Sequence, residues 1–223
     1  PMHTYSIVAR NPETGEMGVA VQSHWFSVGP IVPWAEAGVG AVATQSLVDV
    51  SYGPLGLELM KTGKTAEQAL KALLAADENR EVRQVAMLDK NGNVAVHTGS
   101  KCIPEAGHIK GDNFSVQANL MLSSKVWPAM AEAYQKTKGD LIDKMLATLE
   151  AAEKEGGDLR GRQSAAIVVV KGNSSGKVWE DKIIDLRVED HPQPIQELKR
   201  LVRIHRAYEH MNRGDLAIEK NDF

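Results

Sequence analysis

Four short polar clusters interrupt strand-like, largely apolar segments of this 223-residue chain. The clusters are Gln22-Ser23-His24, Thr44-Gln45-Ser46, Gln117-Ala118-Asn119 and Arg162-Gln163-Ser164. Amides can donate hydrogen bonds to an oxyanion, a serine can act as a nucleophile with a histidine base, and arginine binds carboxylates. An unpaired buried amide costs about 1–3 kcal/mol. The clusters therefore indicate either an internal hydrogen-bonded network or the wall of a pocket, and the pattern alone leaves both open.

The elements that carry these clusters are strands joined as hairpins and helices that occur in pairs. Alternating segments at 4–10 and 17–22 flank the turn-forming residues 11–16 and predict a first hairpin. Further strands are predicted at 39–44, 82–88, 94–98, 114–120, 163–170 and 178–188, with Asn91-Gly92 as a hairpin turn. Helices are predicted at 52–61, 65–74, 126–137 and 141–153, and from Pro194 to a stop at Gly214. A capping box, Thr65 with Gln68, begins the second of them.

This order of elements predicts an α+β fold. Hairpins favour mainly antiparallel sheets, and pairs of helices must cover the outer face of a sheet. Two sheets with helices outside satisfy both requirements. No segment has the composition of a linker, so residues 1–223 are expected to form one domain.

Composition excludes several classes of function. The net charge is −3 and the sequence pI is near 6.2, so no strong positive field is available for nucleic acid or an anionic membrane. One cysteine, Cys102, excludes an internal disulfide framework. No apolar run reaches the roughly 18 residues of a membrane span, and the first residues lack the layout of a secretory signal. A cytoplasmic protein without nucleic-acid or membrane partners is expected.

Cofactor and metal motifs are weak. The glycine motif at 38–43 has the form G-x-G-x-x-A, but β-branched residues follow it where a dinucleotide site needs a helix. The seven histidines show no metal-ligand spacing, and Cys102 followed by Ile103-Pro104 indicates packing rather than a reactive thiol. No cofactor and no metal are expected.

Longer strings resemble one known family. They are TYSIVAR at 4–10, ETG at 13–15, GVAVQS at 18–23, AGVGAVATQS at 37–46, HTG at 97–99, QANL at 117–120, RGRQSAA at 160–166 and DLRVEDHP at 185–192. Together they resemble the domain of unknown function 1028 family, which is placed among the N-terminal-nucleophile (Ntn) hydrolase-like proteins. The resemblance covers nearly the whole chain and implies a four-layer αββα sandwich, in agreement with the predicted order of elements.

The resemblance implies that Thr4 is a nucleophile attacking an amide carbonyl, with its own free α-amine as the base. Asn119 and Gln45 are then candidate oxyanion donors, His24 a proton relay, and Arg162 a clamp for a substrate carboxylate. Gln22, Ser23, Ser46, Gln117 and Gln163 complete the expected substrate-binding residues. A free amine at Thr4 requires removal of residues 1–3. The acid and lysine of proteasome-type members are not matched, because Gln22 and Thr44-Gln45 stand in their places.

The expected function is hydrolysis of an amide or related C–N bond in a small molecule. One alternative is an Ntn-like ligand-binding or assembly protein without catalysis, since fold alone does not decide activity. Another moves the nucleophile to Ser23 or Ser46 with His24 as base. A homodimer is expected, and two alternatives stay open for Trp25-Phe26 and Trp34: packing inside the protein or forming the subunit interface.

Overall fold

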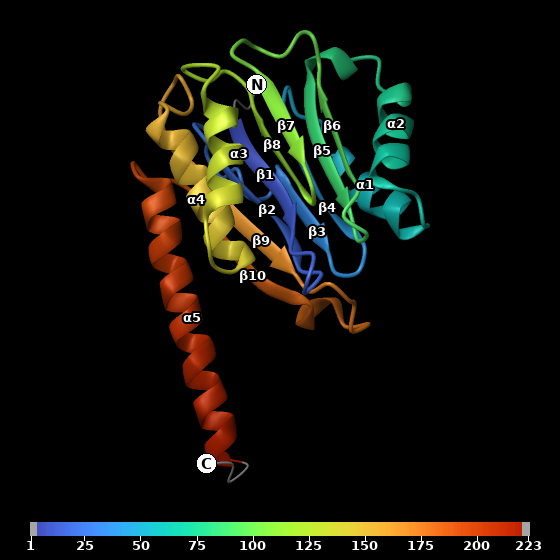
Figure 1. The fold of residues 1–223 in the computed structure, drawn as a ribbon. Helices are drawn as coiled ribbons and strands as arrows, with labels where there is room; N and C mark the ends of the chain where they lie inside the picture. The colour runs from blue at the N-terminus through green and yellow to red at the C-terminus, as the bar shows by residue number, and fades with distance from the viewer. Residues whose placement is uncertain (1–3, 220–223) are drawn as a thin grey trace.

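The structure is a computed structural model that describes residues 4–219, and two β-sheets lie face to face in it between two layers of helices (Figure 1). The strands are β1 Thr4–Arg10, β2 Met17–Ser23, β3 Pro33–Glu36, β4 Gly40–Ser46, β5 Arg83–Asp89, β6 Val94–Thr98, β7 Gly107–Gly111, β8 Phe114–Ala118, β9 Ser164–Val170 and β10 Lys182–Val188. The helices are α1 Tyr52–Lys61, α2 Ala66–Ala76, α3 Val126–Lys136, α4 Leu141–Lys154 and α5 Pro194–Glu219, with short 3₁₀ turns at Arg80–Val82 and Val178–Glu180.

The larger sheet has the order β10-β9-β2-β1-β8-β7, and all of its neighbours are antiparallel. The period of two along β1 separates its side chains. Tyr5 and Ile7 pack with residues of α3 and α4 in one apolar core. Val8 belongs to a second core that lies between the sheets. Thr4 and Ser6 share the face of Val8, so the start of β1 directs hydroxyl groups towards the other sheet.

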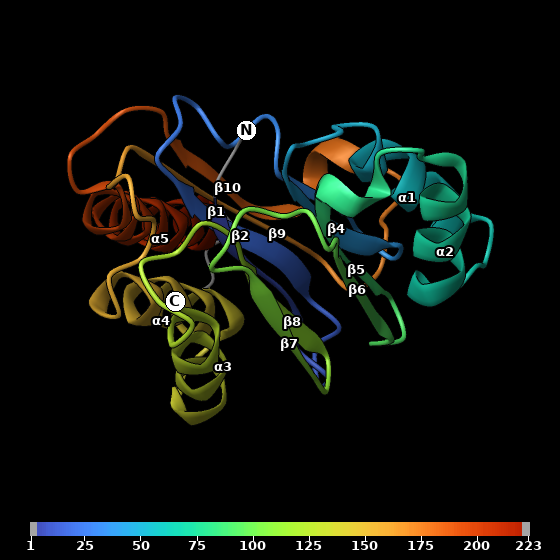
Figure 2. The same ribbon diagram turned by 90° about the horizontal axis from the view of Figure 1, so that it is seen from above.

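The smaller sheet has the order β3-β4-β5-β6 and is also antiparallel. Ala41 and Leu88 meet Val19 and Val21 of the larger sheet in the core between the sheets. Helices α1 and α2 cover the outer face of this sheet through a third core. Seen from above, the helix, sheet, sheet and helix layers follow one another (Figure 2). The structure thus confirms the predicted α+β fold with its αββα layers.

Local sequence signals explain several boundaries. Thr65 accepts a hydrogen bond from the backbone N–H of Gln68, and the Gln68 side chain accepts one from the backbone N–H of Thr65, so the predicted capping box is formed. Gly92 has φ of +88° in the turn between β5 and β6, as the hairpin prediction requires. The glycine motif at 38–43 runs into β4 rather than into a helix, and a Cβ at Gly40 would lie 2.5 Å from the carbonyl oxygen of Leu88.

The structure differs from the sequence prediction in four places. β3 and β7 were not predicted as strands; both are short and lie at sheet edges, where Pro33 needs no ladder partner. The segment 178–180 is a 3₁₀ turn, and β10 begins only at Lys182. The last helix passes through Gly214 and reaches Glu219, since an exposed glycine costs about 1 kcal/mol in a helix but does not end it.

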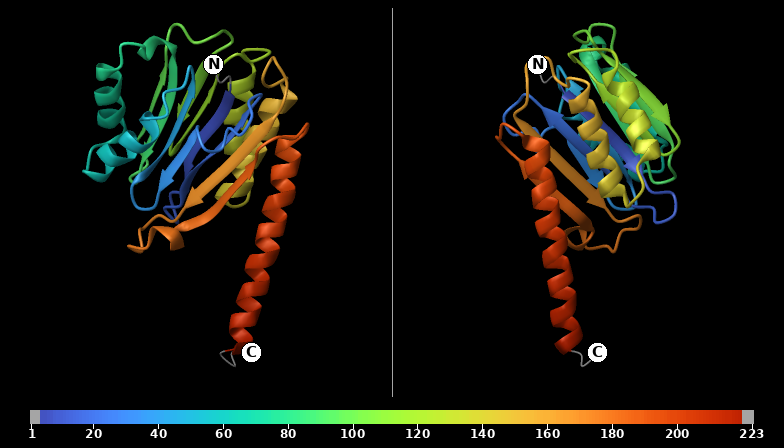
Figure 3. Two further views of the ribbon diagram at one scale, coloured as in Figure 1. Left: turned by 180° about the vertical axis from the view of Figure 1, so that it is seen from behind. Right: turned by 60° about the vertical axis from the view of Figure 1, so that its left-hand side comes forward.

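Helix α5 packs its first turns on β9 and β10 and then extends beyond the sheets (Figure 3). Ile195, Leu198 and Val202 are buried in the core with α4, whereas Tyr208 and Met211 are exposed. No described helix is long and apolar enough to cross a bilayer.

Candidate active site

Thr4 stands at the first position of β1, in the middle of the larger sheet, and is fully buried. It lies opposite Ser23, the last residue of β2. The Thr4 hydroxyl donates a hydrogen bond to Ser23 Oγ over 3.2 Å. Two of the predicted residues therefore meet, and they do so on the face that is turned towards the smaller sheet.

Two side-chain amides converge on the backbone carbonyl of Thr4. Gln45 near the end of β4 donates from Nε2 over 3.2 Å, and Asn119 just beyond β8 donates from Nδ2 over 3.4 Å. The backbone N–H of Asn119 donates to the same oxygen over 3.1 Å. Both predicted oxyanion donors are thus brought to Thr4 from different sheets, although they are hydrogen-bonded to protein groups here.

Gln84 of β5 joins these amides and was missed in the sequence analysis. Its Oε1 accepts from Gln45 Nε2 at 2.7 Å and from Asn119 Nδ2 at 2.9 Å. Its Nε2 donates to the Thr98 hydroxyl at 2.9 Å and to the carbonyl of Ala118 at 2.9 Å. The signal was present, because Gln84 is a buried amide within an apolar strand, as Gln117 is in β8.

The network continues along β1 and β8. The Ser6 hydroxyl donates to Gln45 Oε1 at 2.7 Å and accepts from Gln117 Nε2 at 2.6 Å. Ser115 in turn donates to Gln117 Oε1 at 2.9 Å. Gln117 and Asn119 share one face, as the alternation predicted, and this face is turned towards the smaller sheet. These polar residues form an internal hydrogen-bonded network between the sheets. Of the two alternatives that the sequence left open, an internal network and a pocket wall, this conformation corresponds to the network.

Ser46, the other candidate serine of the β4 cluster, has a separate environment. It has φ of +75°, an uncommon conformation for a residue with a Cβ, and is buried at the end of β4. It lies at the Cys102 thiol, and its hydrogen bond opposes the effect of burial, which raises the pKa of Cys102. Cys102 Sγ donates to the Arg83 carbonyl over 3.3 Å. The thiol is therefore a buried packing group, as its sequence context indicated.

Gln22 lies on the opposite face of the larger sheet from Thr4. It pairs with Tyr5, whose side chain packs towards α4. Within residues 4–219, the amide atoms of Gln22 and the Tyr5 hydroxyl are buried without a hydrogen-bond partner. Burial, followed by the Glu153 carboxylate, raises the pKa of Tyr5 well above its ordinary value. Gln22 is therefore part of a second polar cluster on the helix side of the sheet and does not join the Thr4 network.

The residues near 160 border this second cluster. Arg162 Nε forms an ion pair with Glu153 Oε1 at 2.6 Å. The backbone N–H of His24 donates to Asp158, and Nδ1 of His24 is buried without a partner among the described residues. The backbone carbonyl of Gln163 accepts a hydrogen bond from the backbone N–H of His191. The predicted clamp Arg162 thus pairs with a carboxylate of the protein itself.

Glu153 gives this cluster a pH dependence. Burial raises its pKa, and the ion pair with Arg162 opposes that rise. A carboxyl whose pKa is raised by folding stabilises the fold fully at low pH, and this stabilisation is lost as pH rises through the folded pKa. We expect Glu153→Gln to remove that loss, so its stability relative to the wild type should increase between about pH 4 and pH 7. Urea unfolding at both pH values measures this. The exposed Glu155→Gln is the control, and parallel pH curves for Glu153→Gln and the wild type would contradict the prediction.

No group of three His, Cys, Asp or Glu side chains within residues 4–219 is placed to hold a metal ion. Around Thr4 the donors are hydroxyls and neutral amides, which suits hydrogen bonding to a neutral or anionic oxygen. Residues 1–3, which precede Thr4 and include His3, lie outside the described residues.

No curated protein matches the chain. Among solved structures, Anbu (Gly-1) mutant from Hyphomicrobium sp. strain MC1 has 11% identity and a TM-score of 0.42 over 96% of each chain. Anbu (ancestral beta-subunit) from Yersinia bercovieri has 11% identity and a TM-score of 0.39, also over 96% of each chain. At TM-scores below 0.5 these likenesses do not establish a relationship.

A much stronger match is protein SPO2555 from Silicibacter pomeroyi. It is 30% identical, with a TM-score of 0.81 over 90% of this chain and 85% of that one. The sequence model of the family described as "Family of unknown function (DUF1028)", to which that protein is also assigned, matches residues 4–198. The match begins at Thr4 and takes in all ten strands, and on this evidence the chain belongs to the DUF1028 family.

Proposed function

We propose that this protein is a hydrolase of the N-terminal-nucleophile type, which cleaves an amide or related C–N bond in a small molecule. One observation carries the proposal: the Thr4 hydroxyl lies 3.2 Å from Ser23 Oγ, at a backbone on which the Gln45 and Asn119 amides converge. A nucleophile at the start of a central strand, surrounded by donors, is the arrangement that acyl transfer needs.

The reaction would begin with attack of Thr4 Oγ on the carbonyl carbon, while the hydroxyl proton passes to the α-amine of Thr4. An α-amine titrates near 7.7–8.0, so part of it is a neutral base at neutral pH. Collapse of the tetrahedral intermediate breaks the C–N bond, and the leaving amine takes the proton from the α-ammonium. Water, deprotonated by the same amine, then hydrolyses the ester. The acid is released and the Thr4 hydroxyl is restored.

The neighbouring side-chain amides would supply the hydrogen bonds that the tetrahedral intermediate needs. Gln45 and Asn119 would stabilise the oxyanion, and the loss of one such donor typically costs about 10²–10³ in rate. Because the α-nitrogen of Thr4 must be free to act as the base, we propose that the active form begins at Thr4. Cleavage of the peptide bond before Thr4 would create this base.

Hydrolysis of a panel of small amides, by a chain whose first residue is Thr4, tests the proposal. Loss of activity on Thr4→Ala supports it. Equal activity of the Thr4→Ala chain contradicts it. Activity that follows Ser23 or Ser46 instead, shown by a serine-directed acylating probe, would assign the nucleophile to that residue.

A second candidate function is ligand binding or assembly without catalysis. The specific observation in its favour is that Gln84 links the Gln45 and Asn119 amides, and all three amides also bond to the backbone. The Gln117 amide is held by the Ser6 and Ser115 hydroxyls. Such a network rigidifies a core and needs no substrate. It predicts that a chain beginning at Thr4 hydrolyses none of the panel amides, with or without the Thr4 hydroxyl.

A homodimer also remains a proposal, as does a cytoplasmic location. Trp25 and Phe26 are exposed on the loop after β2, which leaves them available to a second copy. Trp34 is not available, because its ring packs against Gly53 in the core beneath α1 and its Nε1 donates to the Ile31 carbonyl. Light scattering should give about twice the 24.3 kDa of one chain. A monomeric mass would contradict the dimer.

A further inference from the structure

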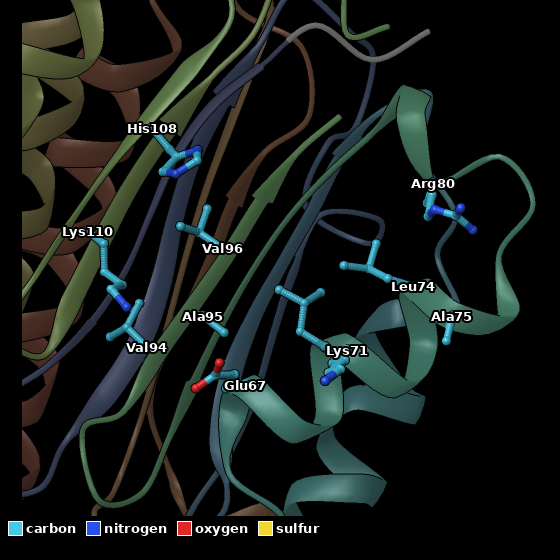
Figure 4. A pocket seen from close by; sticks show the side chains of 11 residues that line it. Glu67, Lys71, Leu74, Ala75, Arg80, Val94, Ala95, Val96, His108 and Lys110 are labelled. Carbon is cyan, nitrogen blue, oxygen red and sulfur yellow. The ribbon is translucent and has the colours of Figure 1, made fainter. Parts of the chain in front are cut away.

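A groove of about 600 Å³ runs over β6, with α2 on one side and β7 on the other (Figure 4). Its floor is apolar and includes Leu70 and Leu74 of α2 together with Val94 and Val96 of β6. The volume lies within the range typical of ligand-binding sites in proteins. The groove borders the Thr4 network at one point, where the His108 ring lies 2.9 Å from the Thr98 hydroxyl, which accepts from Gln84. The proposed hydrolysis does not use the groove.

β6 is an edge strand, and the groove follows its free edge. The backbone N–H of Asp89 donates to Asn93 O, and that of Gly99 donates to Arg83 O. In an antiparallel ladder such hydrogen-bonded pairs recur at every second residue. By this alternation Ala95 and His97 direct their backbone groups to β5, while Val94 and Val96 direct theirs outward. The N–H and C=O groups of Val94 and Val96 therefore line the groove, have no backbone partner within residues 4–219, and can pair with another extended chain.

The rim of the groove is mainly cationic. Lys71 on α2 and Lys110 on β7 have no ion-pair partner among residues 4–219, and Arg80 has only a 3.8 Å contact with Glu81. Glu67 is the acidic residue of the lining. The His108 ring faces the same space, and desolvation, followed by His97 and Lys110, lowers its pKa. The charge distribution thus favours an anionic occupant.

We propose that this groove binds a segment of an acidic peptide, which adds to the free edge of β6 as a fifth strand of the smaller sheet. In this mode of recognition main-chain hydrogen bonds supply affinity and flanking side chains supply specificity. Consecutive residues of an added strand point to opposite faces of the sheet. Adjacent acidic residues would therefore reach Lys71 on one face and Lys110 on the other, above an apolar floor.

A second copy of the chain is a poorer occupant. Pairing of two β6 edges would bring the Lys71, Arg80 and Lys110 side chains of both copies together, and like charges across a sheet are destabilising. A small amphipathic carboxylate would match one cation and the apolar floor. It would leave the outward backbone groups of Val94 and Val96 unpaired, whereas a peptide strand satisfies them.

The probe is the peptide acetyl-Val-Asp-Glu-Val-Thr-amide, which has the length of β6. Titration of the full-length ¹⁵N-labelled protein should shift the amide signals of Val94 and Val96. Lys71→Glu with Lys110→Glu should weaken binding at least about tenfold, since charge pairs that flank an interface are reversed. The exposed pair Lys138→Glu with Lys154→Glu, on the α3–α4 side, is the charge-matched control and should change affinity less than about twofold.

A second peptide, N-methylated at Asp and Glu, tests the pairing itself. Consecutive backbone N–H groups point to opposite edges of a strand. Methylation of two consecutive residues therefore removes one of the donors towards β6, whichever edge of the peptide faces that strand. The methylated peptide should bind at least about tenfold more weakly. Equal affinity of the methylated peptide, or unchanged Val94 and Val96 signals at millimolar peptide, would overturn the proposal. Decanoate serves as the small amphipathic carboxylate, and the proposal would also be overturned if decanoate shifted these signals where the peptide does not. Shifts that grow with protein concentration alone would indicate a second copy of the chain and would overturn it as well.

Discussion

In a chain that begins at Thr4, replacement of Thr4 by alanine is expected to reduce amide hydrolysis by about 10⁴-fold or more. The hydroxyl is the only part of the side chain that forms the new bond, and alanine keeps the α-amine and the backbone in place. The Gln45 and Asn119 amides converge on the Thr4 carbonyl, which alanine also retains. The loss therefore reports on the nucleophile rather than on the donors around it.

Thr4→Ser is the matched control, because serine keeps the hydroxyl and should retain most of the activity. Stability provides the second control. The Thr4 hydroxyl makes a neutral hydrogen bond to Ser23 Oγ, whose loss costs about 1 kcal/mol, so Thr4→Ala should remain folded. Activity of the alanine chain within tenfold of the parent would show that Thr4 is not the nucleophile.

Replacement of Gln84 by leucine is expected to lower the free energy of unfolding by about 3 kcal/mol or more. Gln84 Oε1 accepts from Gln45 and Asn119, and its Nε2 donates to Thr98 and to the Ala118 carbonyl. Leucine has nearly the same volume but offers no partner to any of these groups. Because Gln84 is fully buried, water cannot take over the hydrogen bonds that its partners lose. Urea unfolding measures the change.

Two further substitutions identify the cause of this loss. Gln84→Glu keeps the shape but turns a carboxylate oxygen towards the Ala118 carbonyl, so it should destabilise at least as much as leucine. Gln135→Leu, at an exposed position of α3, should change stability by less than about 0.5 kcal/mol. If Gln84→Leu were as stable as the wild type, the network would not contribute to folding.

The sequence by itself determined the helices, eight of the ten strands and the alternation of faces along a strand; the edge strands β3 and β7 were missed. Alternation along 4–10 separated Thr4 and Ser6 from Tyr5 and Ile7, and the same period placed Gln117 and Asn119 on one face. Both assignments rest on local backbone geometry, in which neighbouring side chains point to opposite sides of a strand. Hairpin turns and the capping box at Thr65 likewise involve residues close together in the chain, so their chemistry is readable from the sequence.

Only the tertiary structure decided which faces meet. Gln22 and Ser23 are adjacent in sequence, yet Ser23 joins Thr4 between the sheets while Gln22 faces α4 with Tyr5. Gln84 connects Gln45 and Asn119 because β4 and β5 stack on β1 and β8, a relation between strands about 35 to 80 residues apart. The free edge of β6 depends equally on sheet order. Periodicity specifies the sides of one strand, whereas packing of the sheets specifies which other strand each side contacts.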